Sequence, residues 1–329
     1  MSAGWRAAAG MVVWCGWALT KVPNLHHGAW AEALVVLAAL VLVPMVIEVA
    51  DGRARNATAR QALGWAARWQ LPGALLLAVS FGLEPGVGAV LLAGAWAGVL
   101  AMLAGSGAVE LWRSPAARPV AWCNEAGLVF AAVGAAWLLA DRAGLQPLGF
   151  SEEIVLLTAV HFHYAGLILP VLAGRALGAV APGKVTAAIA LAVITGVPAV
   201  AVGITATQLA WGGAVERVAA LWMSAAGVAV AVVHVWLGIG TRRAVSVRCL
   251  WVMAGCSLAA GMVLSALYGV RGVFAPWPWL DIPWMRALHG TINAIGFAGC
   301  GTLAWWLAAR RKNDADALRA PGQVGTSGS

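Results

Sequence analysis

The sequence predicts an all-α integral membrane protein, a bundle of about ten transmembrane helices, and two observations carry that prediction. Hydrophobic residues make up 62% of the 329 residues, charged residues make up 10%, and the mean hydropathy is +0.84. The few charged residues lie between apolar stretches about twenty residues long, the length that crosses a bilayer as a helix. A soluble domain needs a charged surface, so this composition excludes a soluble enzyme, and its apolar content excludes a disordered chain.

Ten stretches have this length and composition, each bounded by charged residues, proline or glycine. The first is the weakest, because only fourteen residues separate Arg6 from Lys21. The third includes Arg68 near one end, so that side chain must reach the membrane surface. We predict transmembrane spans at residues 6–22, 30–49, 65–83, 86–104, 119–140, 151–173, 184–209, 215–240, 248–268 and 285–307.

The distribution of basic residues predicts the orientation of these spans. With ten spans, the 21 Lys and Arg residues divide sixteen to five between the two sides. Because cytoplasmic loops of membrane proteins are rich in Lys and Arg, we expect both termini in the cytoplasm and the protein in the inner membrane of a bacterium. The same bias explains the net charge of +8, so we expect no nucleic-acid partner.

The last residues differ in composition from the rest. Residues 313–329 contain Asp, Gly, Ser and Pro and few apolar side chains. We therefore divide the chain into a transmembrane domain, residues 1–312, and a disordered cytoplasmic tail, residues 313–329.

Tryptophan is placed as expected for a membrane protein. Eleven of the 19 Trp residues, Trp30 and Trp305 among them, fall near the ends of predicted spans. An indole ring can sit there at the level of the lipid headgroups, so we interpret these residues as interfacial anchors.

Asp, Glu, Lys and Arg keep to the ends of the predicted spans, and histidine alone breaks this pattern. His161 and His163 lie near the centre of the sixth span, His234 in the inner half of the eighth, and His289 in the first turns of the tenth. An ionisable group inside a bilayer is costly unless it faces protein or water, so each is a functional candidate. We expect the sixth span to be surrounded by protein and Pro170 to loosen the helical hydrogen bonding just before it.

The tenth span carries a polar face. Arg286, His289 and Asn293 follow one another at steps of three or four residues, so they share one side of a helix. Residues two apart on a helix point about 200° away from each other, so His161 and His163 face different neighbours. From the outer face to the middle of the membrane, a polar ladder is predicted from His289, Asn293, His161, His163 and His234.

Three glutamates lie near the predicted cytoplasmic ends of spans. We expect Glu48, Glu110 and Glu125 to pair with arginines of the neighbouring loops.

Two segments resemble a known family. Residues 157–166 read Leu-Thr-Ala-Val-His-Phe-His-Tyr-Ala-Gly and residues 288–297 read Leu-His-Gly-Thr-Ile-Asn-Ala-Ile-Gly-Phe. Both are similar to segments of the YndJ-like family of bacterial multi-pass membrane proteins. The resemblance implies a multi-span fold and leaves the chemistry open. The candidate ligand or proton site is then His161, His163, Tyr164, Arg286, His289 and Asn293.

The leading functional hypothesis is a permease or proton-coupled carrier with a histidine-lined cavity in its second half. Histidine exchanges protons near physiological pH, and Arg286 at the mouth would attract a small anionic or polar solute. Under this hypothesis the protein is not an enzyme and needs no cofactor. Its partners are the lipid bilayer and the solute.

Two alternatives remain open. One is a membrane enzyme that binds haem or a metal ion through His161, His163 and His234, since imidazole is a good ligand for both. Against it, the sequence has no CxxCH or HExxH motif, and its five cysteines lack metal-ligand spacing. The other is a non-catalytic sensor or accessory protein whose polar residues only stabilise helix packing.

Overall fold

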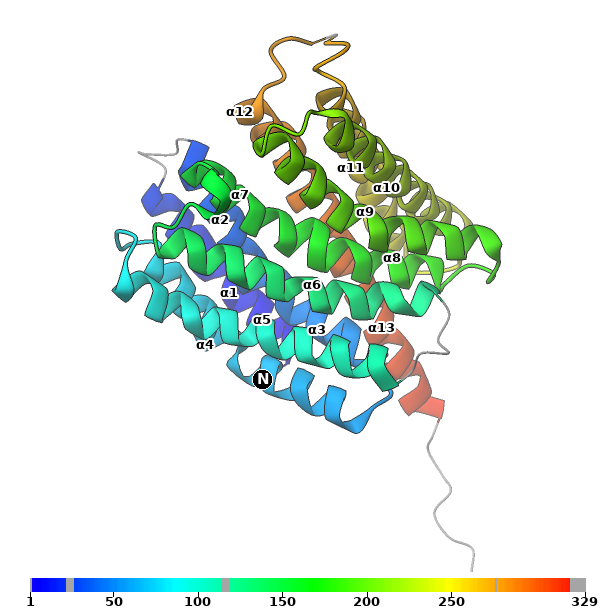
Figure 1. The fold of residues 1–329 in the computed structure, drawn as a ribbon. Coiled ribbons are helices and arrows are strands. Elements are labelled where there is room, and N and C mark those ends of the chain that lie inside the picture. The colour runs from blue at the N-terminus through cyan, green and yellow to red at the C-terminus, as the bar shows by residue number, and fades with distance from the viewer. Residues whose placement is uncertain (1, 22–26, 114–118, 276, 320–329) are drawn as a thin grey trace, which may run out of the picture.

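The computed structural model describes residues 2–21, 27–113, 119–275 and 277–319, and the regular elements among them are all helical. Figure 1 shows them as a bundle of long rods, with α4 and α5 on one side and α10 and α11 on the other. The elements are α1 (Ala3–Lys21), α2 (His27–Leu37), η2 (Ala38–Leu42), α3 (Val43–Asp51), α4 (Ala57–Ser80), α5 (Val87–Arg113), α6 (Pro119–Arg142), η3 (Pro147–Gly149), α7 (Glu152–His161), η4 (Phe162–Ile168), α8 (Leu169–Leu177), α9 (Lys184–Gln208), α10 (Ala214–Gly240), α11 (Val245–Gly269), α12 (Ile282–Trp284), η5 (Met285–Gly290), η6 (Ile292–Gly299) and α13 (Cys300–Arg319).

Eight helices in the described part of the chain are long and apolar enough to cross a membrane, and several are built from consecutive elements. They are Gly28–Asp51, Val87–Arg113, Pro119–Arg142, Glu152–Leu177, Lys184–Gln208, Ala214–Gly240, Val245–Gly269 and Ile282–Arg310. Each overlaps a predicted span. The first and third predicted spans correspond to α1 and α4, which are helices but carry more polar residues, so their crossing of the membrane stays a prediction.

The C-terminal boundary differs from the prediction. The backbone of α13 is helical to Arg319, so the disordered tail predicted from residue 313 begins inside a helix. Residues 320–329 lie outside the described residues.

The helix most completely surrounded by protein is Gly28–Asp51, formed by α2, η2 and α3. It is the most apolar of the eight, and nearly all of its side chains are buried. A helix that is apolar on every side is stable inside a bundle as well as in lipid, which explains this position. The sixth predicted span, residues 151–173, lies in Glu152–Leu177, which is the second most buried of the eight helices. The expectation that protein surrounds this span is therefore met in part.

Wide helical turns occur in three rods. The π-helical segments η2 and η4 are followed at once by α3 and α8, each of which has a proline in its first turn, Pro44 and Pro170. Proline has no N–H to give to the preceding turn and its ring crowds the carbonyl four residues back, so the helix widens there. The predicted loosening before Pro170 is thereby confirmed.

Side chains from neighbouring helices bind the backbone near these wide turns. The Tyr164 hydroxyl donates to the Leu34 carbonyl oxygen at 2.8 Å, and Gln70 Nε2 donates to the Ala39 carbonyl oxygen at 2.7 Å. Trp30 Nε1 also donates to Thr291 Oγ1 at 2.8 Å. These bonds connect the enclosed helix to Glu152–Leu177, to α4 and to Ile282–Arg310.

Close approach of α6 to η4 depends on Gly127. A Cβ atom placed on Gly127 would lie 2.8 Å from the Leu167 carbonyl oxygen, whereas one placed on Gly98 of α5 would meet no atom within 4 Å. Glycine therefore allows the two backbones to touch at the first position only.

We predict opposite effects for the same substitution at these two glycines. Gly127→Ala should lower the free energy of unfolding by about 1–3 kcal/mol, because the added methyl group forces the helices apart. Gly98→Ala should be neutral or stabilising, because alanine favours a helix more than glycine does. Thermal unfolding of both variants in detergent, followed by circular dichroism, checks this. Equal melting temperatures would contradict the packing described here.

Candidate functional site

His163 is a buried histidine with both ring nitrogens in hydrogen bonds. Its side chain is 1% exposed, Nδ1 lies 2.7 Å from the Ala159 carbonyl oxygen, and Trp96 Nε1 donates to Nε2 at 3.0 Å. An indole N–H can only donate and a carbonyl oxygen can only accept. Nδ1 therefore carries the single ring proton, and the imidazole is neutral. His163 has no free nitrogen for a ligand or a metal ion.

His234 repeats this arrangement in another pair of helices. Nδ1 lies 3.0 Å from the Val230 carbonyl oxygen, and Trp305 Nε1 donates to Nε2 at 3.2 Å. His234 is completely buried, and Trp305 is only 6% exposed. The interpretation of Trp305 as an interfacial anchor was therefore wrong, because its indole lies in the core as the donor to a histidine.

The alternative metal site does not assemble. His163 and His234 have separate Trp partners, and His161 lies elsewhere, near His289. Among the described residues, no three His, Cys, Asp or Glu side chains come together where they could hold a metal ion. Tyr164 uses its hydroxyl group in a hydrogen bond to the Leu34 carbonyl oxygen of the enclosed helix.

Arg286 lines a pocket between the helices Gly28–Asp51, Glu152–Leu177 and Ile282–Arg310. The pocket has a volume of about 290 Å³ and is lined by residues of α2, α7, α12 and η5, namely Gly28, Ala31, Glu153, Leu156, Leu157, Pro283 and Arg286. The Arg286 side chain is 3% exposed and pairs through Nη1 with Glu153, which is 44% exposed. Arg286 Nη2 is buried and finds no acceptor among the described residues.

This arrangement leaves part of a buried guanidinium without a partner. Leaving a buried donor unpaired costs about 1–3 kcal/mol, and more when the group is charged. A carboxylate or phosphate oxygen within reach of Nη2 would supply the missing acceptor. That Arg286 lies at the mouth of the polar ladder stays a prediction.

His289 and Asn293 continue the polar face of this helix. His289 Nδ1 donates to the Gly261 carbonyl oxygen at 2.8 Å, and Asn293 Nδ2 donates to the His289 carbonyl oxygen at 2.9 Å. His289 Nε2 has only a long contact of 3.5 Å with Asn293 Nδ2. His161, on α7, is exposed at the surface of the protein. It interacts electrostatically with His289. Four of the six predicted residues thus belong to one region, while His163 and Tyr164 make hydrogen bonds to Trp96 of α5 and to Leu34 of α2.

Sequence reasoning missed Glu153. Two acidic residues, Glu152 and Glu153, open the helix that carries the histidines, which was the available signal. Which of them would meet Arg286, 133 positions along the chain, depends on how the helices pack.

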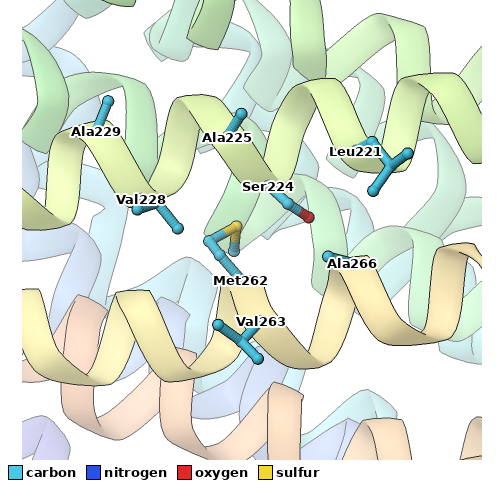
Figure 2. A pocket seen from close by; sticks show the side chains of 8 residues that line it. All are labelled: Leu221, Ser224, Ala225, Val228, Ala229, Met262, Val263 and Ala266. Carbon is cyan, nitrogen blue, oxygen red and sulfur yellow. The ribbon is translucent and has the colours of Figure 1, made fainter. Parts of the chain in front are cut away.

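A second hollow lies on the outside of the bundle. Figure 2 shows this groove of about 480 Å³ between α10 and α11, lined by Leu221, Ser224, Ala225, Val228, Ala229, Met262, Val263 and Ala266. Its polar group is the Ser224 hydroxyl, whose oxygen has no partner among the described residues. None of the predicted site residues lines this groove, and its chemistry suits a hydrocarbon chain better than a polar solute.

Comparison with known proteins agrees with this picture. A family model described as "YndJ-like protein" matches residues 33–297. A relative named "Uncharacterized membrane protein YndJ", from Bacillus subtilis (strain 168), is 27% identical over 213 residues, which is 64% of this chain and 37% of the relative. The chain therefore matches well under half the length of that relative. No solved structure matches.

We predict that the His–Trp pairs stabilise the fold. Trp96→Phe should lower the free energy of unfolding by about 1–3 kcal/mol, because it leaves His163 Nε2 buried without a donor. Trp305→Phe should act in the same way on His234. Trp112→Phe is the matched control, because Trp112 lies on the same helix as Trp96 and is 87% exposed. Thermal unfolding by circular dichroism measures all three, and a similar loss for Trp112→Phe would argue against a specific hydrogen bond.

Proposed function

The chain belongs to the YndJ-like family of membrane proteins, and we propose that this multi-pass membrane protein is a carrier for a small anionic or polar solute. The observation that carries the proposal is the buried Arg286 guanidinium, which has an unpartnered Nη2 and lines a pocket. The family supplies the membrane location but no activity. The solute class therefore rests on the chemistry of this pocket.

The pocket suits an anion with two oxygen atoms. A guanidinium group presents parallel N–H donors that match a carboxylate or a phosphate. Glu153 occupies only Nη1, and its side chain is nearly half exposed, so it can turn toward water when an anion binds. The apolar walls formed by Ala31, Leu156 and Leu157 strengthen the attraction by excluding water.

The histidines next to the pocket provide a route for a proton. His289 Nδ1 is held by the Gly261 carbonyl oxygen, which leaves Nε2 to accept a proton. His161 is its electrostatic neighbour, so the two rings disfavour being charged together. A proton taken up by one of them would accompany the anion and neutralise part of its charge.

The proposal includes an orientation in the inner membrane of a bacterium. The sixteen-to-five division of basic residues favours cytoplasmic termini, which would open the Arg286 pocket to the outside. Uptake from that side would begin at Arg286.

We predict that small anions stabilise the purified protein through Arg286. Acetate, phosphate and sulfate would be tested one by one for a rise in melting temperature. A ligand at about 100 times its Kd stabilises by about 2.7 kcal/mol. Arg286→Gln should abolish the response, whereas Arg271→Gln should keep it, because Arg271 is 41% exposed and pairs with Glu216. A response that survives Arg286→Gln would contradict the proposed site.

We also predict that His161 and His289 are needed for transport but not for folding. Uptake of the stabilising anion into proteoliposomes should be lost in His161→Ala and His289→Ala, while both variants insert and remain folded. Loss of folding in either variant would indicate a packing role instead. Retained uptake would exclude these histidines from the proton route.

A further inference from the structure

Two glutamates are buried at the end of the bundle opposite the Arg286 pocket. We call this the basic end, because the loop of residues 52–56 between α3 and α4 carries Arg53 and Arg55 there. Glu110 on α5 is 3% exposed and Glu125 on α6 is 4% exposed. An ionised carboxylate so deeply buried is stable only when charges or hydrogen bonds compensate it.

Glu110 has compensation on one side only. Its Oε1 accepts hydrogen bonds from the backbone N–H groups of Arg55 at 2.7 Å and Asn56 at 2.6 Å. Its Oε2 is 3.9 Å from Arg55 Nε and accepts no hydrogen bond from the described residues. Glu110 therefore fixes the loop to α5, and the predicted pairing of this residue with a loop arginine is confirmed.

Glu125 is compensated by one backbone hydrogen bond, from its own N–H group, whereas Glu110 has two. Glu125 Oε2 is buried and has no hydrogen-bond partner among the described residues. The charged and titratable groups that act on it are Glu110 from α5, Arg53 and Arg55 from the loop, and Cys123 on its own helix.

Arg53 is a weak partner for Glu125, because it is engaged elsewhere. Its Nη2 donates to the Gly174 carbonyl oxygen at 3.3 Å. Burial lowers the pKa of the Arg53 guanidinium from its ordinary value, and the Glu125 carboxylate opposes that effect.

The geometry points to Glu125 as a proton-binding site that works together with the Arg286 pocket. Two neighbouring carboxylates in a medium without water disfavour being ionised together. Glu110 is tied to the loop by two N–H donors, so Glu125 is the member of the pair that accepts the proton. The reaction is transfer of a proton from a hydronium ion in the solution at the basic end to Glu125 Oε2, which becomes an O–H group and leaves a water molecule; release reverses it. This role rests on the proposed carrier function.

A metal cation is a poorer occupant than a proton. Hard cations such as calcium need six or more oxygen ligands, whereas two carboxylates are available here and the guanidinium groups of Arg53 and Arg55 lie nearby. A proton needs one oxygen atom and supplies the missing donor.

Infrared difference spectroscopy of the full-length protein between low and high pH tests this inference. The C=O group of a protonated carboxyl has its own infrared stretching band. The frequency of this band differs between a buried carboxyl group and one in water. We expect this band in the wild type, its loss in Glu125→Gln, and its retention in Glu48→Gln, since Glu48 is exposed. A band that persists in Glu125→Gln would overturn the proposal.

A second variant keeps the test informative if Glu125→Gln fails to fold. Glu110→Gln removes the neighbouring negative charge, so the Glu125 band should titrate about one pH unit or more lower than in the wild type. An unchanged midpoint would show that the two carboxyl groups do not interact. Adding sodium chloride at constant pH should leave the band intact, and its loss would assign the site to a metal ion instead.

The failure of this inference can be separated from failure of the carrier proposal. Glu125→Gln should keep the anion-induced rise in melting temperature, because Arg286 is untouched, but should lose proton-driven uptake. If the anion response is missing from the wild type as well, the Arg286 site has failed while the infrared band still decides the Glu125 site.

Discussion

A polar group in the hydrocarbon layer of a membrane has no water to bond, so the protein must supply its partner. Several buried polar groups among the described residues obey that constraint. Two histidines each use one nitrogen on a backbone carbonyl and the other on an indole N–H, and Gln70 and Tyr164 bind carbonyl groups of the enclosed helix. Other buried side chains, such as Gln70, Ser80 and Asn124, keep one atom without a partner among the described residues. Arg286 and Glu125 belong to this group and can carry a charge, so an anion and a proton are the partners we propose for them.

The positions of the helices could be predicted from the sequence, but the contacts between side chains of different helices could not. Apolar length alone located every long helix, because a membrane span must satisfy its own backbone and needs no information about its partners. The polar face of Arg286, His289 and Asn293 was also predictable, since it is a property of one helix. The sequence did not predict that His161 and His163 have different environments. His163 accepts a hydrogen bond from Trp96 of α5, and this contact depends on how α5 packs against the helix of the two histidines.

The enclosed helix, Gly28–Asp51, connects the two ends of the bundle. Its first residues form a wall of the Arg286 pocket, and the loop after its last residue binds Glu110. Between them lies a π-helical segment, a kind of irregularity that is often found at functional sites. A small shift of this helix would therefore act on both ends, which is the coupling that a carrier requires.

The same helix also has a consequence for how the protein is made. Synthesis runs from the N-terminus to the C-terminus, so this helix enters the membrane before α5 through α13 exist to cover it. At that stage lipid surrounds its sides, and later the arriving helices displace the lipid. A helix that is apolar on every side is stable both in lipid and in contact with other helices. It can therefore remain in the bilayer until the remaining helices pack around it.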